Sequence, residues 1–154
     1  MRYFRGLALS LAALVGILAC DKESHELNTP LRSVWLNLPL QAQAYRALLE
    51  PTGAVTIVEP PTETSAIGYA GVLIVHGLLP NQFYAYDLSC PVENSPIIRI
   101  VGHDPLNVRC PKCQTKYDVL SGSGAAVLSG SGRSPLRKYK AFYHEVERKL
   151  TISN

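Results

Sequence analysis

The sequence has no apolar run long enough to cross a membrane as a helix. Its longest such stretch, residues 6–19, covers about 14 residues, whereas a spanning helix needs about 20. Its only basic cluster is RKYK at 137–140, and nucleic-acid binding requires a basic face that neutralises many phosphates. With a formal net charge of only +3, the composition predicts no nucleic-acid partner.

The chain also lacks the patterns that carry common catalytic chemistry. SGSG occurs at 121–124 and at 129–132, but without the strand, lysine and helix that a phosphate-binding loop needs. No serine stands in a Gly-x-Ser-x-Gly elbow, which is the usual signature of a hydrolase nucleophile. We therefore expect no catalytic residues, and a carrier or binding function rather than an enzyme.

The first 30 residues have the features of a targeting segment followed by a tether. Arg2 and Arg5 precede the apolar run, and ILAC at 17–20 resembles a bacterial lipobox. This resemblance implies a signal peptide over 1–19, acyl chains on Cys20 and a polar, lipidated tether over 20–30. We expect a lipid-anchored membrane protein of the bacterial cell envelope that faces the periplasm or the exterior.

The remaining residues, 31–154, are expected to form one β domain. They show no repeat and no long helical periodicity, and short β-rich runs alternate with Gly and Pro. QAQAYRALLE at 41–50 is expected to be a short helix or turn. The expected strands are 33–38, 53–59, 70–77, 82–89, 97–101, 116–121, 125–130, 136–146 and 149–153.

This spacing of short strands predicts an all-β fold, a small antiparallel sandwich or barrel. AGVLIVHG at 70–77 is continuously apolar, which predicts a strand that is buried on both faces. Trp35 and the tyrosines fall mostly in expected strands, where core packing is the default. Helices are nearly absent, so we expect any functional site to lie on loops.

Three of the four cysteines lie in CPVENSPIIRIVGHDPLNVRCPKC, residues 90–113. Cys110 and Cys113 form a Cys-x-x-Cys pair, which is a common half of a zinc site, although no second pair is present. Thiolates are soft ligands that suit zinc or an iron–sulfur centre. A fourth ligand is required, and the candidates are His103 and, as the alternative, Glu93.

A disulfide is the second interpretation of these thiols, because disulfides persist in secreted proteins. A Cys90–Cys110 bond would tie the two cysteine loops, and a Cys110–Cys113 bond would be a tight bridge of the redox type. The alternative function is then a cluster-less structural or binding module with a crosslinked loop tip. The residues alone leave metal, disulfide and free thiols open.

Three segments, GVLIVHGLLPNQFYAYDLSCP, RCPKCQTKYDV and SGSGAAVLSGSGRSPLRKY, resemble the Rieske iron–sulfur domain in content and order. The resemblance covers residues 70–154 and implies an all-β domain with two loops that meet at one tip. In that family two cysteines and two histidines hold a [2Fe–2S] cluster. Cys90 and Cys110 match the cysteines, whereas Val92 and Cys113 stand at the histidine positions.

Valine has no lone pair for iron, so Val92 rules out the usual two-histidine ligand set. A [2Fe–2S] cluster with more cysteine ligands, zinc, or no metal are the remaining alternatives. Thr115 and Tyr117 stand where the family often has a serine and a tyrosine that hydrogen-bond the cluster. The resemblance further implies one-electron transfer, with a redox protein or a quinone system as the partner.

Overall fold

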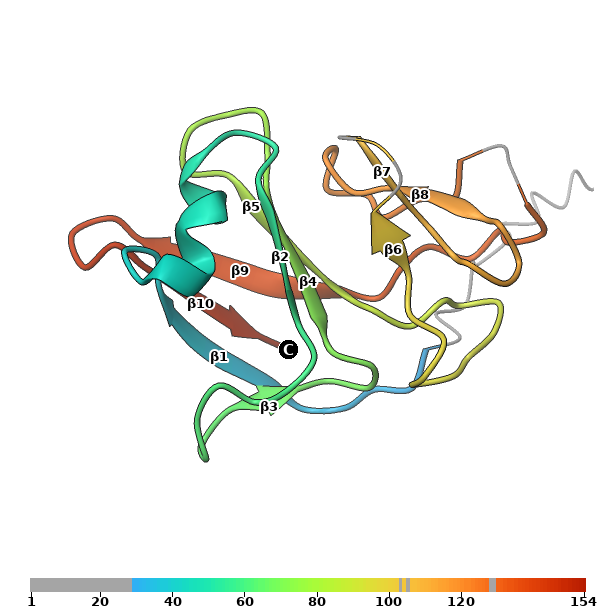
Figure 1. Cartoon of the computed structure of the whole chain (residues 1–154), viewed down its shortest axis with the longest axis horizontal. Coiled ribbons are helices and arrows are strands. Elements are labelled where there is room, and N and C mark those ends of the chain that lie inside the picture. The colour runs from blue at the N-terminus through green and yellow to red at the C-terminus, as the bar shows by residue number, and fades with distance from the viewer. Residues whose placement is uncertain (1–28, 103, 105, 128–129) are drawn as a thin grey trace, which may run out of the picture.

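The computed structural model describes residues 29–102, 104, 106–127 and 130–154. Two antiparallel sheets form this part of the chain (Figure 1). The larger sheet has seven strands, in the order β2 (Ala54–Ile57), β4 (Val72–His76), β5 (Phe83–Asp87), β9 (Lys138–His144), β10 (Lys149–Ser153), β1 (Val34–Pro39) and β3 (Ala66–Ile67). The smaller sheet has three, in the order β6 (Val101–Gly102), β7 (Asn107–Arg109) and β8 (Lys116–Asp118).

The larger sheet curls over a first core. Leu36 of β1 and Leu150 of β10 belong to the same buried cluster as Ile57 of β2 and Ile74 of β4, although these strand pairs lie in opposite parts of the strand order. Side chains from the two halves of the sheet therefore fill the space between them, as in a sandwich or barrel. The predicted all-β antiparallel class is confirmed.

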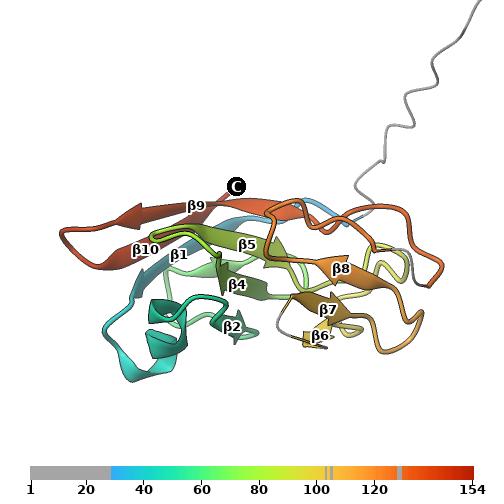
Figure 2. The ribbon, with the colours of Figure 1, turned by 90° about the horizontal axis from the view of Figure 1, so that it is seen from above.

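A second core lies between the larger sheet and the smaller one, which stand side by side in Figure 2. Strand β4 serves both cores because successive side chains on a strand point to opposite faces. Ile74 packs in the first core, and Leu73 and Val75 pack in the second. All five residues of β4 are buried, which confirms the prediction of a strand with two covered faces.

Strand β1 shows the period-2 alternation of a half-buried strand. Leu36 is fully buried, while Trp35 is 49% exposed. The expectation that Trp35 packs in the core is therefore wrong: its neighbours Val34 and Leu36 take the two inward positions, so Trp35 points outward. The short helix or turn expected at 41–50 is confirmed as a 3-10 helix, η1 (Gln43–Leu49).

The smaller sheet differs most from the expectation. The run at 97–101 contributes only the start of β6, after an isolated bridge from Arg99 to Ser89. In the described part of 125–130, only Ala126 forms a bridge, to Tyr117. Strands β3 and β7 were not expected, because two or three residues are too few to show a periodicity and their pairing comes from tertiary neighbours.

Among the described residues, no helix is long and apolar enough to span a bilayer.

Candidate metal centre

Two cysteine loops meet at the end of the molecule that carries the smaller sheet (Figure 2). Loop 1, residues 90–94, begins three residues after β5 ends, and loop 2, residues 110–114, joins β7 to β8. Strand pairing between β7 and β8 fixes loop 2 at both ends. The carboxylate of Asp87, buried at the end of β5, accepts a hydrogen bond from the Ser89 N–H at 2.8 Å and so fixes the entry to loop 1.

The two loops have the same backbone design. Each begins with Cys-Pro, and the N–H of the fifth residue donates to the carbonyl of the first, at 2.9 Å for Asn94 to Cys90 and 3.1 Å for Gln114 to Cys110. Each fifth residue also has a positive φ, 44° at Asn94 and 62° at Gln114. A closed turn of this kind holds the side chain of its first residue in a fixed position, so both loops are built to present a thiol.

The thiols of Cys90, Cys110 and Cys113 converge, because their Sγ atoms all lie within 4.8 Å of one another. Three atoms at such separations all lie within about 2.8 Å of one common point, which is close to a zinc–sulfur bond of about 2.3 Å. Cys90 and Cys110 are buried and Cys113 is partly buried. The arrangement surrounds one point from three sides, which is the geometry that a single metal ion requires.

The thiols are not bonded to one another. The structure describes the three as free cysteines, and the Sγ atoms of Cys90 and Cys113 are 3.5 Å apart, well beyond a disulfide bond of about 2.05 Å. The two sulfurs are nevertheless in contact with each other. The disulfide hypothesis therefore remains chemically accessible, now with Cys90 and Cys113 as the pair at a measured short distance.

Hydroxyl groups surround the sulfurs. The buried Tyr117 hydroxyl lies 3.4 Å from Cys90 Sγ, and the buried Thr115 hydroxyl lies 3.2 Å from Cys113 Sγ. Thr115 also accepts a hydrogen bond from the Gly132 N–H at 2.9 Å, so a third segment closes over loop 2. Thr115 and Tyr117 were predicted from the family resemblance as hydrogen-bonding residues, and both lie beside a thiol.

Residues 130–132 form the segment that lies over loop 2, and two of these positions require glycine. Gly130 has a φ of 82°, and a Cβ at this position would lie 2.5 Å from the Thr115 backbone. A Cβ at Gly132 would lie 2.8 Å from Val92 Cγ2 and 2.9 Å from Thr115 Cγ2. The backbone of residues 130–132 therefore packs directly against Val92 of loop 1 and against Thr115, the residue that follows loop 2.

The protein environment acts differently on two of the thiols. Burial raises the pKa of Cys110 to about 12, so the free thiol stays protonated. Burial also opposes ionisation of Cys113, but hydrogen bonds with the Thr115 hydroxyl and N–H and with the thiols of Cys90 and Cys110 together outweigh it and lower the pKa of Cys113. Burial, followed by the contact with Cys90, raises the pKa of Tyr117, so the tyrosine remains a hydrogen-bond donor.

The two predicted fourth ligands have different outcomes. His103 lies outside the described residues, as does Cys20. The Glu93 carboxylate is not part of the group formed by the three sulfurs and instead pairs with Lys112 Nζ at 2.5 Å. Its side chain is only 10% exposed, so this carboxylate is held near the surface of the cysteine tip rather than in open solvent.

The residues present do not fit a two-histidine [2Fe–2S] cluster. Val92 is 41% exposed, offers no donor atom and packs against the Gly132 backbone. Cys113 replaces the second histidine, and its sulfur sits with the other two around one point. A binuclear cluster instead needs ligands divided between two irons. The donor set fits a mononuclear thiolate site better.

Buried Asp87 organises the base of loop 1 and was missed by the sequence analysis. It accepts hydrogen bonds from the Tyr139 hydroxyl at 2.6 Å and the Tyr69 N–H at 2.9 Å. It is fully buried, and each carboxylate oxygen has a donor, as a buried charge requires. The strand motif Tyr-Asp before the first cysteine was the available signal, but a single carboxylate in a sequence does not reveal its donors.

The two described histidines, His76 and His144, do not belong to the group of sulfurs. His76 is 7% exposed and stacks on Phe83 with ring centroids 4.7 Å apart, so it packs against an aromatic ring. His144 is the last residue of β9, with Nε2 lying 3.3 Å from the Thr151 hydroxyl on β10.

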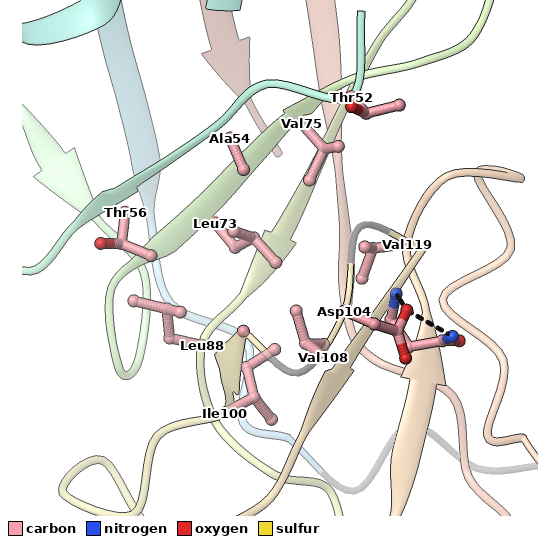
Figure 3. Close-up of a pocket in the computed structure, with 12 residues that line it drawn as sticks. Thr52, Ala54, Thr56, Leu73, Val75, Leu88, Ile100, Asp104, Val108 and Val119 are labelled. Carbon is pink, nitrogen blue, oxygen red and sulfur yellow. Dashed lines mark hydrogen bonds between the residues drawn. The ribbon is translucent and has the colours of Figure 1, made fainter. Parts of the chain in front are cut away.

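A pocket lies between the two sheets, away from the sulfurs (Figure 3). It has a volume of about 210 Å³, and its lining is largely aliphatic, with Leu73 and Val75 of β4 on one side and Val108 of β7 on the other. The side chains of Asp104 and Asn107 at one end are hydrogen-bonded to each other at 2.9 Å.

No family model and no curated protein matches the chain. Among solved structures, it is similar to a Mycobacterium tuberculosis protein described as the small subunit of an NADH-dependent nitrite reductase. The two share 16% identity with a TM-score of 0.42, over 80% of this chain and 96% of that one. A similarity at this level carries no weight for family or function, and the all-β class rests on the strands themselves.

Proposed function

We propose that this protein binds one metal ion through the thiolates of Cys90, Cys110 and Cys113. The observation that carries the proposal is the convergence of three sulfurs within 4.8 Å of one another from two loops of the same design. Zinc and iron both suit a thiolate-rich tetrahedral site. Zinc would make the centre structural, and iron would make it a one-electron carrier whose partner is a redox protein or a quinone system.

The role of the metal follows from the surroundings of the site. The smaller sheet has strands of two or three residues only, and so small a sheet has little stability of its own. A metal held by both loops would crosslink the end of β5 to the β7–β8 hairpin. Binding free energy of a structural metal is then folding free energy for this part of the molecule.

The test is elemental analysis for zinc and iron, with a visible spectrum, on the full chain purified without oxygen. We expect about one metal ion per chain. Cys113→Ser should lose most of it, while Glu63→Ala, an exposed change outside the site, should keep it. Brown protein with about two irons per chain would instead indicate a non-standard [2Fe–2S] carrier.

The disulfide-crosslinked module is the second candidate function, and the 3.5 Å separation of Cys90 and Cys113 Sγ favours it. Mass spectrometry with and without reductant distinguishes it, because a disulfide removes two hydrogen atoms from the chain. A chain that takes up no zinc or iron after reconstitution, and whose mass rises on reduction, would replace the metal proposal with this one.

We further propose that Cys20 is lipidated and anchors the domain to a membrane of the bacterial envelope. The first described residue, Thr29, lies beside loop 1, because its buried hydroxyl is 3.0 Å from Ser89 Oγ and its carbonyl accepts from Arg137 Nε at 2.9 Å. The tether would thus enter the domain next to the cysteine tip. Metabolic labelling with a palmitate analogue tests this anchor, and uptake of label by Cys20→Ala would overturn it.

A further inference from the structure

The two cysteine loops share a turn design, so each residue of loop 1 can be compared with the residue at the same position of loop 2. When the loops are aligned on their shared turn, Cys90 corresponds to Cys110, Pro91 to Pro111 and Asn94 to Gln114. The second thiol of loop 2, Cys113, then corresponds to Glu93 in loop 1. Both are the fourth residue of a turn closed by the same hydrogen bond between its first and fifth residues.

Glu93 has the properties of a ligand at this position. Its side chain is 10% exposed, and a carboxylate that gives up most of its water needs compensating charge. One carboxylate oxygen, Oε2, contacts Lys112 Nζ at 2.5 Å, and no described residue hydrogen-bonds Oε1. Carboxylate oxygens bind zinc at distances close to those of histidine nitrogen.

An ion pair joins the two loops. Lys112, the residue before Cys113 in loop 2, contacts the carboxylate of Glu93 in loop 1. In the metal-bound state, Lys112 would hold one carboxylate oxygen of Glu93 and leave the other oxygen for the metal, as outer partners of metal ligands do. Three thiolates and a carboxylate around a dication form a centre with a net negative charge, and the charge of Lys112 partly offsets it.

We propose that Glu93 supplies the fourth ligand and makes the centre a Cys₃Glu site, with Lys112 holding the carboxylate. The inference rests on the three-thiolate site of the proposed function. In the structure the carboxylate lies outside the group of sulfurs, so metal binding would require its side chain to rotate inward. The matching turn presents Cys113 to the sulfur group, which is the reason to place a ligand at the same position of loop 1.

The first experiment titrates the full chain with Co²⁺, whose absorption reports both tetrahedral coordination and the number of thiolates. We expect Glu93→Ala to weaken Co²⁺ and Zn²⁺ binding by about 10-fold or more, at least as much as loss of an outer partner, and to change the d–d bands. Glu63→Ala, which removes an exposed glutamate elsewhere, should match the unmodified chain. Circular dichroism checks that each variant is folded.

The second experiment asks whether position 93 reaches the metal at all. Glu93→Cys should convert the site to four thiolates, and the sulfur-to-cobalt charge-transfer absorption per Co²⁺ should rise by about one third. A spectrum for Glu93→Cys that stays that of three thiolates would overturn the proposal, as would a Glu93→Ala affinity and spectrum equal to those of the unmodified chain. Both results would leave the three-thiolate site standing, whereas an unmodified chain without Co²⁺ or Zn²⁺ binding would refute the site itself.

Discussion

The curled larger sheet and the cysteine-bearing segment, residues 88–137, are stabilised in different ways. The larger sheet has strands of up to seven residues and a core of mainly aliphatic side chains. The cysteine-bearing segment has strands of two or three residues, and its core includes Cys90, Cys110 and Tyr117. Both parts bury apolar side chains, but the core beside the smaller sheet also includes the thiols that form the candidate metal site.

The two parts also differ in net charge. Residues 88–137 contain six Lys and Arg against three Asp and Glu, a net +3, while 29–87 and 138–154 together contain six of each, a net of zero. Three thiolates around a dication carry one excess negative charge, and a surplus of cations nearby lowers the cost of holding that charge. The charge distribution therefore suits a thiolate centre in the cysteine-bearing segment.

The largest effect on stability is expected from Leu36→Ala, which tests whether the larger sheet is stable without a metal at the cysteine site. Leu36→Ala removes a fully buried side chain from the first core and should lower the free energy of unfolding by about 2–5 kcal/mol. Denaturant titration with and without added Zn²⁺ measures it. A loss that differs greatly between the two conditions would show that the two parts are not separate.

Metal removal should act mainly on the cysteine-bearing segment. At a free metal concentration 100 times Kd, binding stabilises the folded state by about 2.7 kcal/mol. We therefore expect a chelator to speed amide hydrogen exchange at Val108 and Tyr117, while Leu150 and Ile152 in the larger sheet keep most of their protection. Equal loss of protection in both sheets would contradict the proposed division.

Loss of the Tyr117 hydroxyl should have a smaller effect. Tyr117→Phe keeps the buried ring and removes the hydroxyl that lies 3.4 Å from Cys90 Sγ, so we expect about 10-fold weaker zinc binding. Competition with a chromophoric chelator measures the affinity. The matched control is Tyr86→Phe, which removes another buried hydroxyl, bonded to the Val119 carbonyl at 3.1 Å. If both variants bind zinc alike, the contact with Cys90 contributes nothing.

The smallest effect is expected at Trp35. This side chain is 49% exposed on β1, so Trp35→Ala should cost about 1 kcal/mol or less, because half of its surface already contacts water. Thermal unfolding compared with Leu36→Ala makes the test, since the two residues are neighbours on opposite faces. A cost similar to that of Leu36→Ala would mean that another molecule or segment covers Trp35.

Local patterns in the sequence were sufficient for part of the fold. The period-2 alternation at 33–38 and the continuous apolar run at 70–77 correctly predicted β1 and β4, because both signals report which side chains must leave water. Strand β7 could not be predicted, since its three residues form a strand only through pairing with β6 and β8. The same limit applies to Trp35, whose aromatic character does not reveal which face of β1 is covered.

For the candidate site, the sequence by itself determined the residue types, the Cys-x-x-Cys spacing of Cys110 and Cys113, and the absence of a donor at Val92. These properties are local, and a covalent chain carries them into any fold. Only the tertiary structure decided that Cys90, 20 positions before Cys110, meets the other two sulfurs, and that Glu93 stands at the position of loop 1 that matches Cys113 in loop 2. Such convergence depends on how β5 and the β7–β8 hairpin pack across the second core, and packing between distant segments has no local signature.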